Sequence, residues 1–96
     1  MKGINKMNKT IITVIGKDRV GIIAKICTYL ADNKVNILDI TQTIVRGYFN
    51  MMMIVDTSTS SKSFDEIISD LDQVGMEIGV AIKAQHEDIF TKMHRL

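Results

Sequence analysis

The sequence predicts an α+β fold: a four-stranded antiparallel sheet with two helices on one face, plus a short C-terminal helix. Three observations lead to this prediction. Four segments have the β-branched content or the strict alternation of strands, and two segments between them carry apolar residues at helical spacing. Only Arg46-Gly47 separates the two central strand segments, which is typical of a β-hairpin. The resulting order of elements is β-α-β-β-α-β.

The first strand and the first helix are predicted from residues 9–32. Residues 9–15 are nearly all apolar or β-branched, as in a central strand covered on both faces. Gly16 ends this strand, and Asp18 is the expected N-cap because its carboxylate can accept hydrogen bonds from the first helical turn. Asn33 is expected to take the left-handed conformation that closes the helix. Its predicted core stripe consists of Val20, Ile23, Ala24, Cys27, Leu30 and Ala31.

The hairpin that follows is predicted to have long strands. Residues 35–45 form its first strand and residues 48–56 its second. On the second strand, alternation places Met51 and Met53 on one face and Met52 on the other. Methionines that fill gaps on both faces of a sheet are the ordinary explanation of this run.

A second helix and a fourth strand complete the sheet. Ser63 to Glu66 has the S-x-x-E form of a capping box, and Gly75 is expected to stop the helix. Residues 77–85 alternate between apolar and other residues, which predicts a half-buried strand. The core stripe of this helix is predicted to be Phe64, Ile67, Ile68, Leu71 and Val74.

The two ends of the chain are assigned separately. Residues 1–8 are expected to form a disordered extension, residues 9–86 the domain, and residues 87–96 a C-terminal helix. That helix is acidic at its start and basic at its end, as the helix dipole prefers. The whole arrangement is a ferredoxin-like sandwich. The apolar residues of the C-terminal helix are Ile89, Phe90 and Met93.

Composition narrows the class of protein. The chain has 96 residues, enough for one domain. Its formal charge of +1 provides no excess of positive charge that would attract nucleic acid or an anionic membrane. Its one cysteine, Cys27, cannot form an internal disulfide, so we expect a cytoplasmic protein. No apolar run approaches the length of a membrane span, and the start has no apolar signal segment.

Three functional classes are disfavoured by particular residues. Arg46-Gly47-Tyr48 matches the start of an RNA-recognition signature, but Phe49 then stands where a small residue is expected and Asn50 where the second stacking aromatic belongs. Arg19 and Asn36 superficially suit an acylphosphatase-like enzyme, but Asp18 beside Arg19 would repel a phosphate. His86 and His94 have weak spacing for metal ligands. With no nucleophile beside a base, we expect a non-enzymatic protein without cofactor or metal.

A homodimer is predicted from an edge strand and a helix face. In the ferredoxin-like arrangement the strand 35–45 lies at an edge, and it has no proline or lysine to protect it from pairing. Three apolar residues stacked on the first helix suggest a partner surface beside this edge. The alternative is a monomer whose C-terminal helix covers those residues. The predicted interface consists of Ile22, Ile26, Tyr29, Asn36, Ile37 and Leu38.

Residues 13–43 also resemble a known family. They contain a strand, the loop G-x-D-x-x-G from Gly16 to Gly21, a helix of the form I-A-x-[IV]-x-x-x-L, and N-I-x-D-I on the next strand. This pattern is similar to an ACT domain over about residues 9–86. The chain resembles small stand-alone bacterial ACT-domain proteins and, more loosely, the ACT halves of the glycine cleavage system repressor.

The resemblance implies an amino acid bound at a dimer interface and regulation of a protein partner. A ligand carboxylate could approach the helix N-terminus over Gly21, and Asp18 could receive an ammonium group. Asn36 would face the partner's loop across a two-fold axis. Alternatively, the glycines serve turns and packing, nothing binds, and the dimer is a scaffold or adaptor. The implied site consists of Gly16, Asp18, Arg19, Val20, Gly21, Ile22, Asn36 and Ile37.

Overall fold

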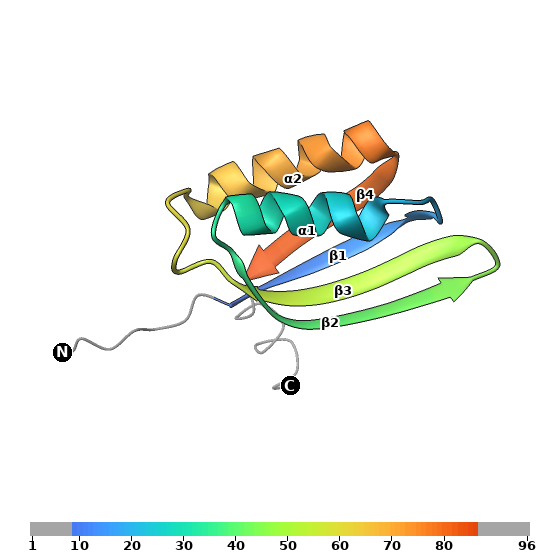
Figure 1. The fold of residues 1–96 in the computed structure, drawn as a ribbon, viewed down its shortest axis with the longest axis horizontal. Coiled ribbons are helices and arrows are strands. Elements are labelled where there is room, and N and C mark those ends of the chain that lie inside the picture. Colours follow the sequence, from blue (N-terminus) through green and yellow to red (C-terminus); the bar gives the residue numbers. More distant parts are fainter. Residues whose placement is uncertain (1–8, 87–96) are drawn as a thin grey trace, which may run out of the picture.

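The computed structural model describes residues 9–86, which form a single antiparallel sheet covered on one face by two helices (Figure 1). The strands lie in the order β2-β3-β1-β4, so the predicted ferredoxin-like topology is confirmed and β2 is an edge strand. The predicted N-terminal extension and C-terminal helix lie outside the described residues. The elements are β1 Lys9–Lys17, α1 Ile22–Asp32, β2 Asn36–Val45, β3 Tyr48–Asp56, α2 Phe64–Ile78 and β4 Val80–His86.

The core lies between the helices and the helix-facing side of the sheet. Along β3, Met51 and Met53 are buried while Met52 is exposed, which confirms the predicted alternation. The expectation that β1 is covered on both faces is wrong at one end, because Ile15 is 55% exposed on the face without helices. The buried apolar cluster is Ile12, Val14, Ile22, Ile26, Leu30, Val35, Phe49, Met51, Met53, Val55, Ile67, Leu71, Val80 and Ile82.

Helix α1 buries a different face from the one predicted. Ile22 and Ile26 are in the core, 2% and 0% exposed, whereas Val20 precedes the helix and is fully exposed. Ala24 and Ala31, assigned to the predicted core stripe, are exposed. Burial of large branched side chains stabilises more than burial of alanine, so the isoleucine face prevails.

The predicted partner surface on α1 is therefore wrong. Its two isoleucines are core residues, and Tyr29 is half-buried against the core. The Tyr29 hydroxyl donates to Asp70 Oδ2 on α2 at 2.6 Å, and Lys62 pairs with the same carboxylate. Burial, followed by the hydrogen bond to Asp70, raises the pKa of Tyr29. This face of α1 therefore supports neither the predicted dimer nor the monomer alternative, because its isoleucines are buried in the core.

The loop before α1 is shaped by two glycines in different ways. Gly21, not Asp18, is the N-cap, with φ of 91° and no side-chain cap. Asp18 instead donates its backbone N–H to Gly47 O at 2.8 Å. Gly16 does not end β1, which continues to Lys17, and its φ is not in the left-handed region. A Cβ on Gly16 would lie 2.7 Å from Val80 Cγ1, so glycine is needed there for the close approach of β4.

One hairpin turn and one helix capping box were predicted from local signals, and both form. Arg46 and Gly47 have φ of 53° and 80°, as a two-residue hairpin with primed turn geometry requires. In the capping box, Glu66 N–H donates to Ser63 Oγ at 3.1 Å and Ser63 N–H donates to Glu66 Oε1 at 2.8 Å. At the end of α1, Lys34 rather than Asn33 takes the left-handed conformation.

The end of α2 lies later than predicted. The helix continues through Gly75 to Ile78, and Gly79 ends it with φ of 77°. A Cβ on Gly75 would lie 2.7 Å from Val80 O, so this glycine lets β4 return closely against the helix. The fourth strand accordingly starts at Val80, three residues after its predicted start. Among residues 9–86, no helix is long and apolar enough to span a membrane.

Candidate ligand-binding site

A hollow of about 270 Å³ lies between the β1–α1 loop and strand β2. The loop contributes charged side chains, the start of α1 contributes apolar ones, and β2 and β3 contribute one glutamine and two apolar side chains. Asp18 is held in place here by its backbone bond to the β2–β3 hairpin. The lining residues are Asp18, Arg19, Gly21, Ile22, Ile23, Ala24, Gln42, Ile44 and Phe49.

The N-terminus of α1 opens into this hollow without a capping side chain. Gly21 adopts the left-handed conformation, and nothing lies within 4 Å of the position that its Cβ would take. The first turn of α1 contains no acidic residue, and its first helical backbone bond runs from Lys25 N to Gly21 O at 2.9 Å. The preceding N–H groups and the positive end of the helix dipole therefore favour an anion.

Arg19 reaches towards α2. A Cβ on Gly79 would lie 3.5 Å from Arg19 Cζ, so the guanidinium group lies beside the residue that ends α2. A cation at the C-terminal end of a helix is favourable because the carbonyl groups there carry partial negative charge. Val20 points into solvent. Of the predicted loop residues, Asp18, Arg19, Gly21 and Ile22 line the hollow, whereas Gly16 and Val20 do not.

Asn36 and Ile37 lie at the other end of the sheet. Asn36 pairs with Asp56, which pairs with Lys9, whereas Val45 pairs with Tyr48 beside the loop. Nine residue steps of strand separate Asn36 from Val45, which is roughly 30 Å. Within one chain, the two parts of the predicted site therefore do not meet.

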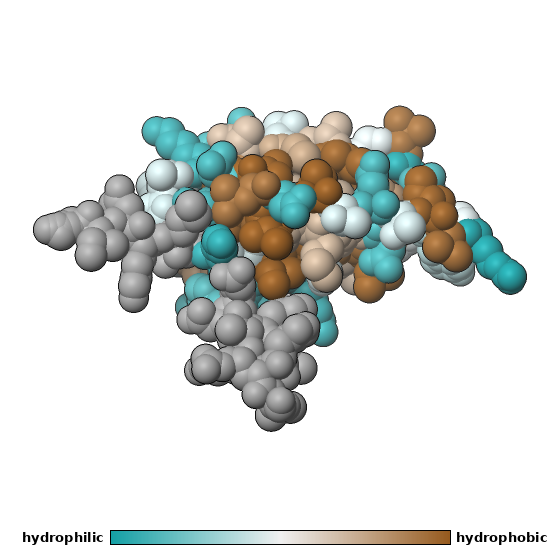
Figure 2. Space-filling model, turned by 90° about the horizontal axis from the view of Figure 1, so that it is seen from below, coloured by the Kyte–Doolittle hydropathy of each residue, from teal (hydrophilic) through white to brown (hydrophobic). Residues whose placement is uncertain are grey.

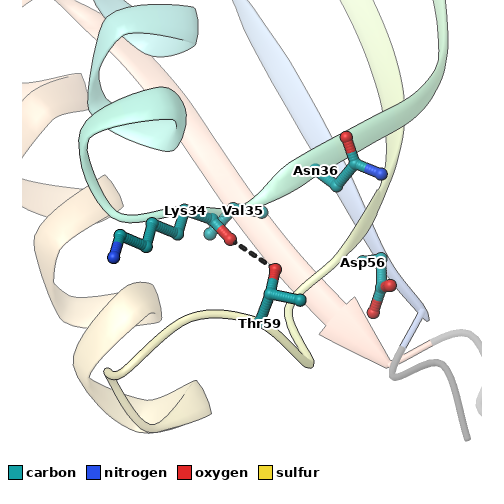
Figure 3. Close-up of a pocket in the computed structure, with 5 residues that line it drawn as sticks. All are labelled: Lys34, Val35, Asn36, Asp56 and Thr59. Atoms are coloured by element: carbon teal, nitrogen blue, oxygen red, sulfur yellow. Dashed lines mark hydrogen bonds between the residues drawn. The ribbon is translucent and has the colours of Figure 1, made fainter. Parts of the chain in front are cut away.

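A second hollow, of about 370 Å³, surrounds Asn36 (Figure 3). It is lined by Lys34, Val35, Asn36, Asp56 and Thr59. Thr59 Oγ1 donates to Lys34 O at 2.7 Å and fixes the loop after β3 against the start of β2. Asp56 is 9% exposed, and its Oδ1 accepts from Ser58 N–H at 3.0 Å. Figure 3 shows Asn36 and Asp56 on neighbouring strands, with the Lys34 side chain directed away from them.

Strand β2 is exposed along its whole length. All ten of its residues are exposed, although Ile37, Ile40 and Ile44 face the same side of the sheet as the helices. A bulge at Leu38 interrupts the register, and Asp39 Oδ1 accepts from Ile40 N–H at 2.8 Å. Within residues 9–86, nothing covers the apolar side chains and the backbone groups at this edge.

Comparison with known proteins identifies the family. The model of the ACT domain matches residues 8–85. The chain belongs to the ACT domain family. It is 59% identical over 90 residues to a UPF0237 protein of Bifidobacterium longum, covering 94% of this chain and 100% of the relative.

Solved structures agree with this assignment. An ACT domain protein from Streptococcus pneumoniae superimposes with a TM-score of 0.78 and 36% identity, over 88% of this chain and 96% of that chain. A putative glycine cleavage system transcriptional repressor superimposes with a TM-score of 0.75 and 18% identity, over 85% of this chain and 47% of that chain. The resemblance inferred from the G-x-D-x-x-G loop is confirmed, and this small ACT domain has the fold of a typically regulatory, ligand-binding module.

Sequence reasoning missed several residues around the two hollows of the ACT domain. Gln42 and Ile44 line the first, and Asp56 and Thr59 line the second. Gln42 and Ile44 pair with the buried residues Met51 and Phe49, which places them on the helix side of the sheet. Alternation within 35–45 combined with the hairpin turn could have identified these two, whereas the loop after β3 carries no such signal.

Within residues 9–86 no group of three His, Cys, Asp or Glu side chains could hold a metal ion. Cys27 is a free, half-buried cysteine on α1 that packs against the core. The hollow beside the loop combines the N-terminus of α1 and the Asp18 carboxylate with apolar side chains from α1, β2 and β3.

Proposed function

We propose that this ACT domain is a regulatory module that binds an amino acid at an interface between two copies of the chain. The proposal is carried by one observation: the uncapped N-terminus of α1 opens into a hollow whose other wall is the exposed edge strand β2. The ligand carboxylate lies at the N–H groups after Gly21, and Asp18 receives its ammonium group. Ile44 and Phe49 contact its side chain.

Pairing of two β2 strands would complete the site. When two identical strands pair in antiparallel fashion, the first residue of one lies opposite the last residue of the other. Asn36 would then stand beside the partner's Val45 and hence beside the partner's loop, about 30 Å from its own. The interface thus consists of Asn36, Ile37 and Leu38 with the rest of β2, without Ile22 and Ile26. One pairing accounts for both the exposed edge and the divided site.

The size of the first hollow limits the ligand. A volume of about 270 Å³ is at the small end of ligand pockets, which suits a single amino acid. Asp18 and the N-terminus of α1 recognise the two charged groups of the ligand, and the apolar lining residues contact its side chain. A protein partner then senses the occupied dimer. A single cysteine is consistent with a reducing compartment, and we place this non-enzymatic module in the cytoplasm.

A dimeric scaffold without a metabolite is the second candidate. Strand β2 gains from pairing whether or not a ligand binds, because its backbone and apolar side chains are exposed in the single chain. Gly16 and Gly21 also have structural reasons of their own: the contact with Val80 and the positive φ. In this alternative the dimer binds a protein through a surface that no metabolite alters.

Thermal unfolding with each of the twenty amino acids at millimolar concentration separates the two candidates. A ligand at about 100 times its Kd adds about 2.7 kcal/mol and raises Tm by roughly 10 °C or more. Light scattering on the same samples measures the mass. A rise in Tm with one or a few amino acids supports the sensor, whereas a dimer that responds to none supports the scaffold.

The site is tested with a double variant, Asp18→Ala with Asn36→Ala. We expect it to abolish the ligand-dependent rise in Tm. Asn50→Ala is the matched control, because Asn50 is an exposed amide on β3 that lines neither hollow. If the double variant keeps the full response to an amino acid, the proposed residues are wrong even though a ligand binds.

A further inference from the structure

A row of four residues with two isoleucines at its centre crosses the face of the sheet without helices. Gln85, Ile11, Ile54 and Asp39 lie side by side across β4, β1, β3 and β2, with the two isoleucines in the middle. Figure 2 shows hydrophobic side chains gathered over the middle of this face and towards the β2–β3 hairpin. Both described helices lie on the opposite face (Figure 1).

Exposure along this face is uneven. Ile11 is 7% exposed, whereas Ile15, four residues further along the same strand and on the same face, is 55% exposed. Ile54, beside Ile11, is half-buried. Ile11 lies between the larger side chains of Ile54 and Gln85, whereas Ile15 lies between Asn50 and Ala81. The end of the face around Ile11 thus carries the larger neighbouring side chains.

Strand β4 delivers the chain to this end of the sheet. His86 ends β4 opposite Thr10, next to the row that contains Ile11. Ten residues, 87–96, follow. The row spans three strand spacings, about 14 Å, and a ten-residue helix is about 15 Å long. A helix that starts at β4 would therefore end over β2.

The spacing of apolar residues in this segment matches the spacing of the strands. Phe90, Met93 and Leu96 recur every three residues, which is about 4.5 Å along a helix against about 4.8 Å between strands. Starting from β4, these side chains would lie over β1, β3 and β2 in turn. Phe90 would contact Ile11, and Met93 would contact Ile54.

The charges of residues 87–96 are opposite in sign to those at the two sides of the open face. Its acidic residues, Glu87 and Asp88, come first, beside β4, where Lys83 is exposed on the same face. Its basic residues, Lys92 and Arg95, come last, towards β2, where Asp39 lies. A helix in the reverse direction would place like charges together.

We propose that residues 87–96 form an amphipathic helix that docks on the open face of its own sheet and crosses it from β4 to β2. The sandwich then has three layers. This surface lies on the face of the sheet opposite the hollow beside the β1–α1 loop, so its test does not depend on a ligand.

Crosslinking tests the proposed contact directly. In a Cys27→Ser background, Met52→Cys on β3 is combined with Met93→Cys and treated with a short bismaleimide. We expect most chains to acquire an intramolecular crosslink, seen by mass. Lys25→Cys on the exposed side of α1, combined with Met93→Cys, is the matched control and should not crosslink. A yield no higher than the control would overturn the docking, and a covalent dimer would assign the surface to a second copy.

Stability gives a second measurement on the full chain. Phe90→Ala should lower Tm by roughly 5–15 °C, because it removes a buried aromatic side chain. Thr91→Ala, on the other side of the predicted helix, should leave Tm nearly unchanged. Equal Tm values for the two variants would contradict the proposal.

Discussion

The Ile26→Ala variant tests whether α1 buries the face that carries Ile22 and Ile26. Ile26 is 0% exposed and lies in the core cluster. The substitution removes three carbon atoms, about 2.4 kcal/mol at 0.8 kcal/mol for each, and leaves a cavity that adds to the loss. We therefore expect a decrease of about 3 kcal/mol in the free energy of unfolding, which lowers Tm by roughly 15 °C.

The assay is urea unfolding followed by circular dichroism at two protein concentrations. Ile15→Ala is the matched control, because this isoleucine is largely exposed on the open face, and its change should stay within about 0.5 kcal/mol. If Ile26 is a core residue, its substitution lowers the free energy of unfolding equally at both protein concentrations. A decrease in the free energy of unfolding below about 1 kcal/mol would refute the packing argument. A decrease confined to concentrations at which the chain self-associates would also refute it and would indicate that Ile26 lies on a partner surface.

Two further predictions concern the loop and the link between the helices. Gly21→Ala should lower the free energy of unfolding in urea by about 1–2 kcal/mol, because alanine disfavours φ of 91° even though the space around the residue is open. An unchanged free energy of unfolding would contradict the strain argument. Hydrogen bonds from Lys62 and then from Tyr29 lower the pKa of Asp70, so its contribution is present above the ordinary aspartate pKa and is lost as pH falls through the lowered value. Asp70→Asn should flatten the dependence of Tm on pH between about 5 and 2; an unaltered slope would show that this pairing contributes nothing.

Two local signals, the hairpin turn and the capping box, were read correctly from the sequence because the residues involved lie within a few positions of one another. The hairpin depends on Arg46-Gly47 alone, and the capping box joins Ser63 to a glutamate three residues later. The buried face of α1 could not be chosen in the same way. Ile22 and Ile26 compete with Ile23 and Cys27 on one helix, and only contact with the sheet and α2 decides between them.

Glycines show the same division between local and long-range causes. Gly16 and Gly75 were assigned to a strand end and a helix end, yet both lie inside their elements. Each leaves room for Val80, which is 64 residues from the first (80 − 16) and five from the second (80 − 75). A sequence pattern shows that a glycine is present but not which neighbour approaches it.

The candidate site was predicted as one group of residues, and the structure divides it between the two ends of β2. A bulge at Leu38 interrupts the register of the first part of this edge. From Ile40 to Val45 the strand is regular, and Gln42 and Ile44 there line the hollow beside the loop. A partner strand on this part would close the open side of the hollow. Under the proposed function, ligand binding and dimerisation would then strengthen each other by the same factor, because coupling between two binding equilibria is reciprocal.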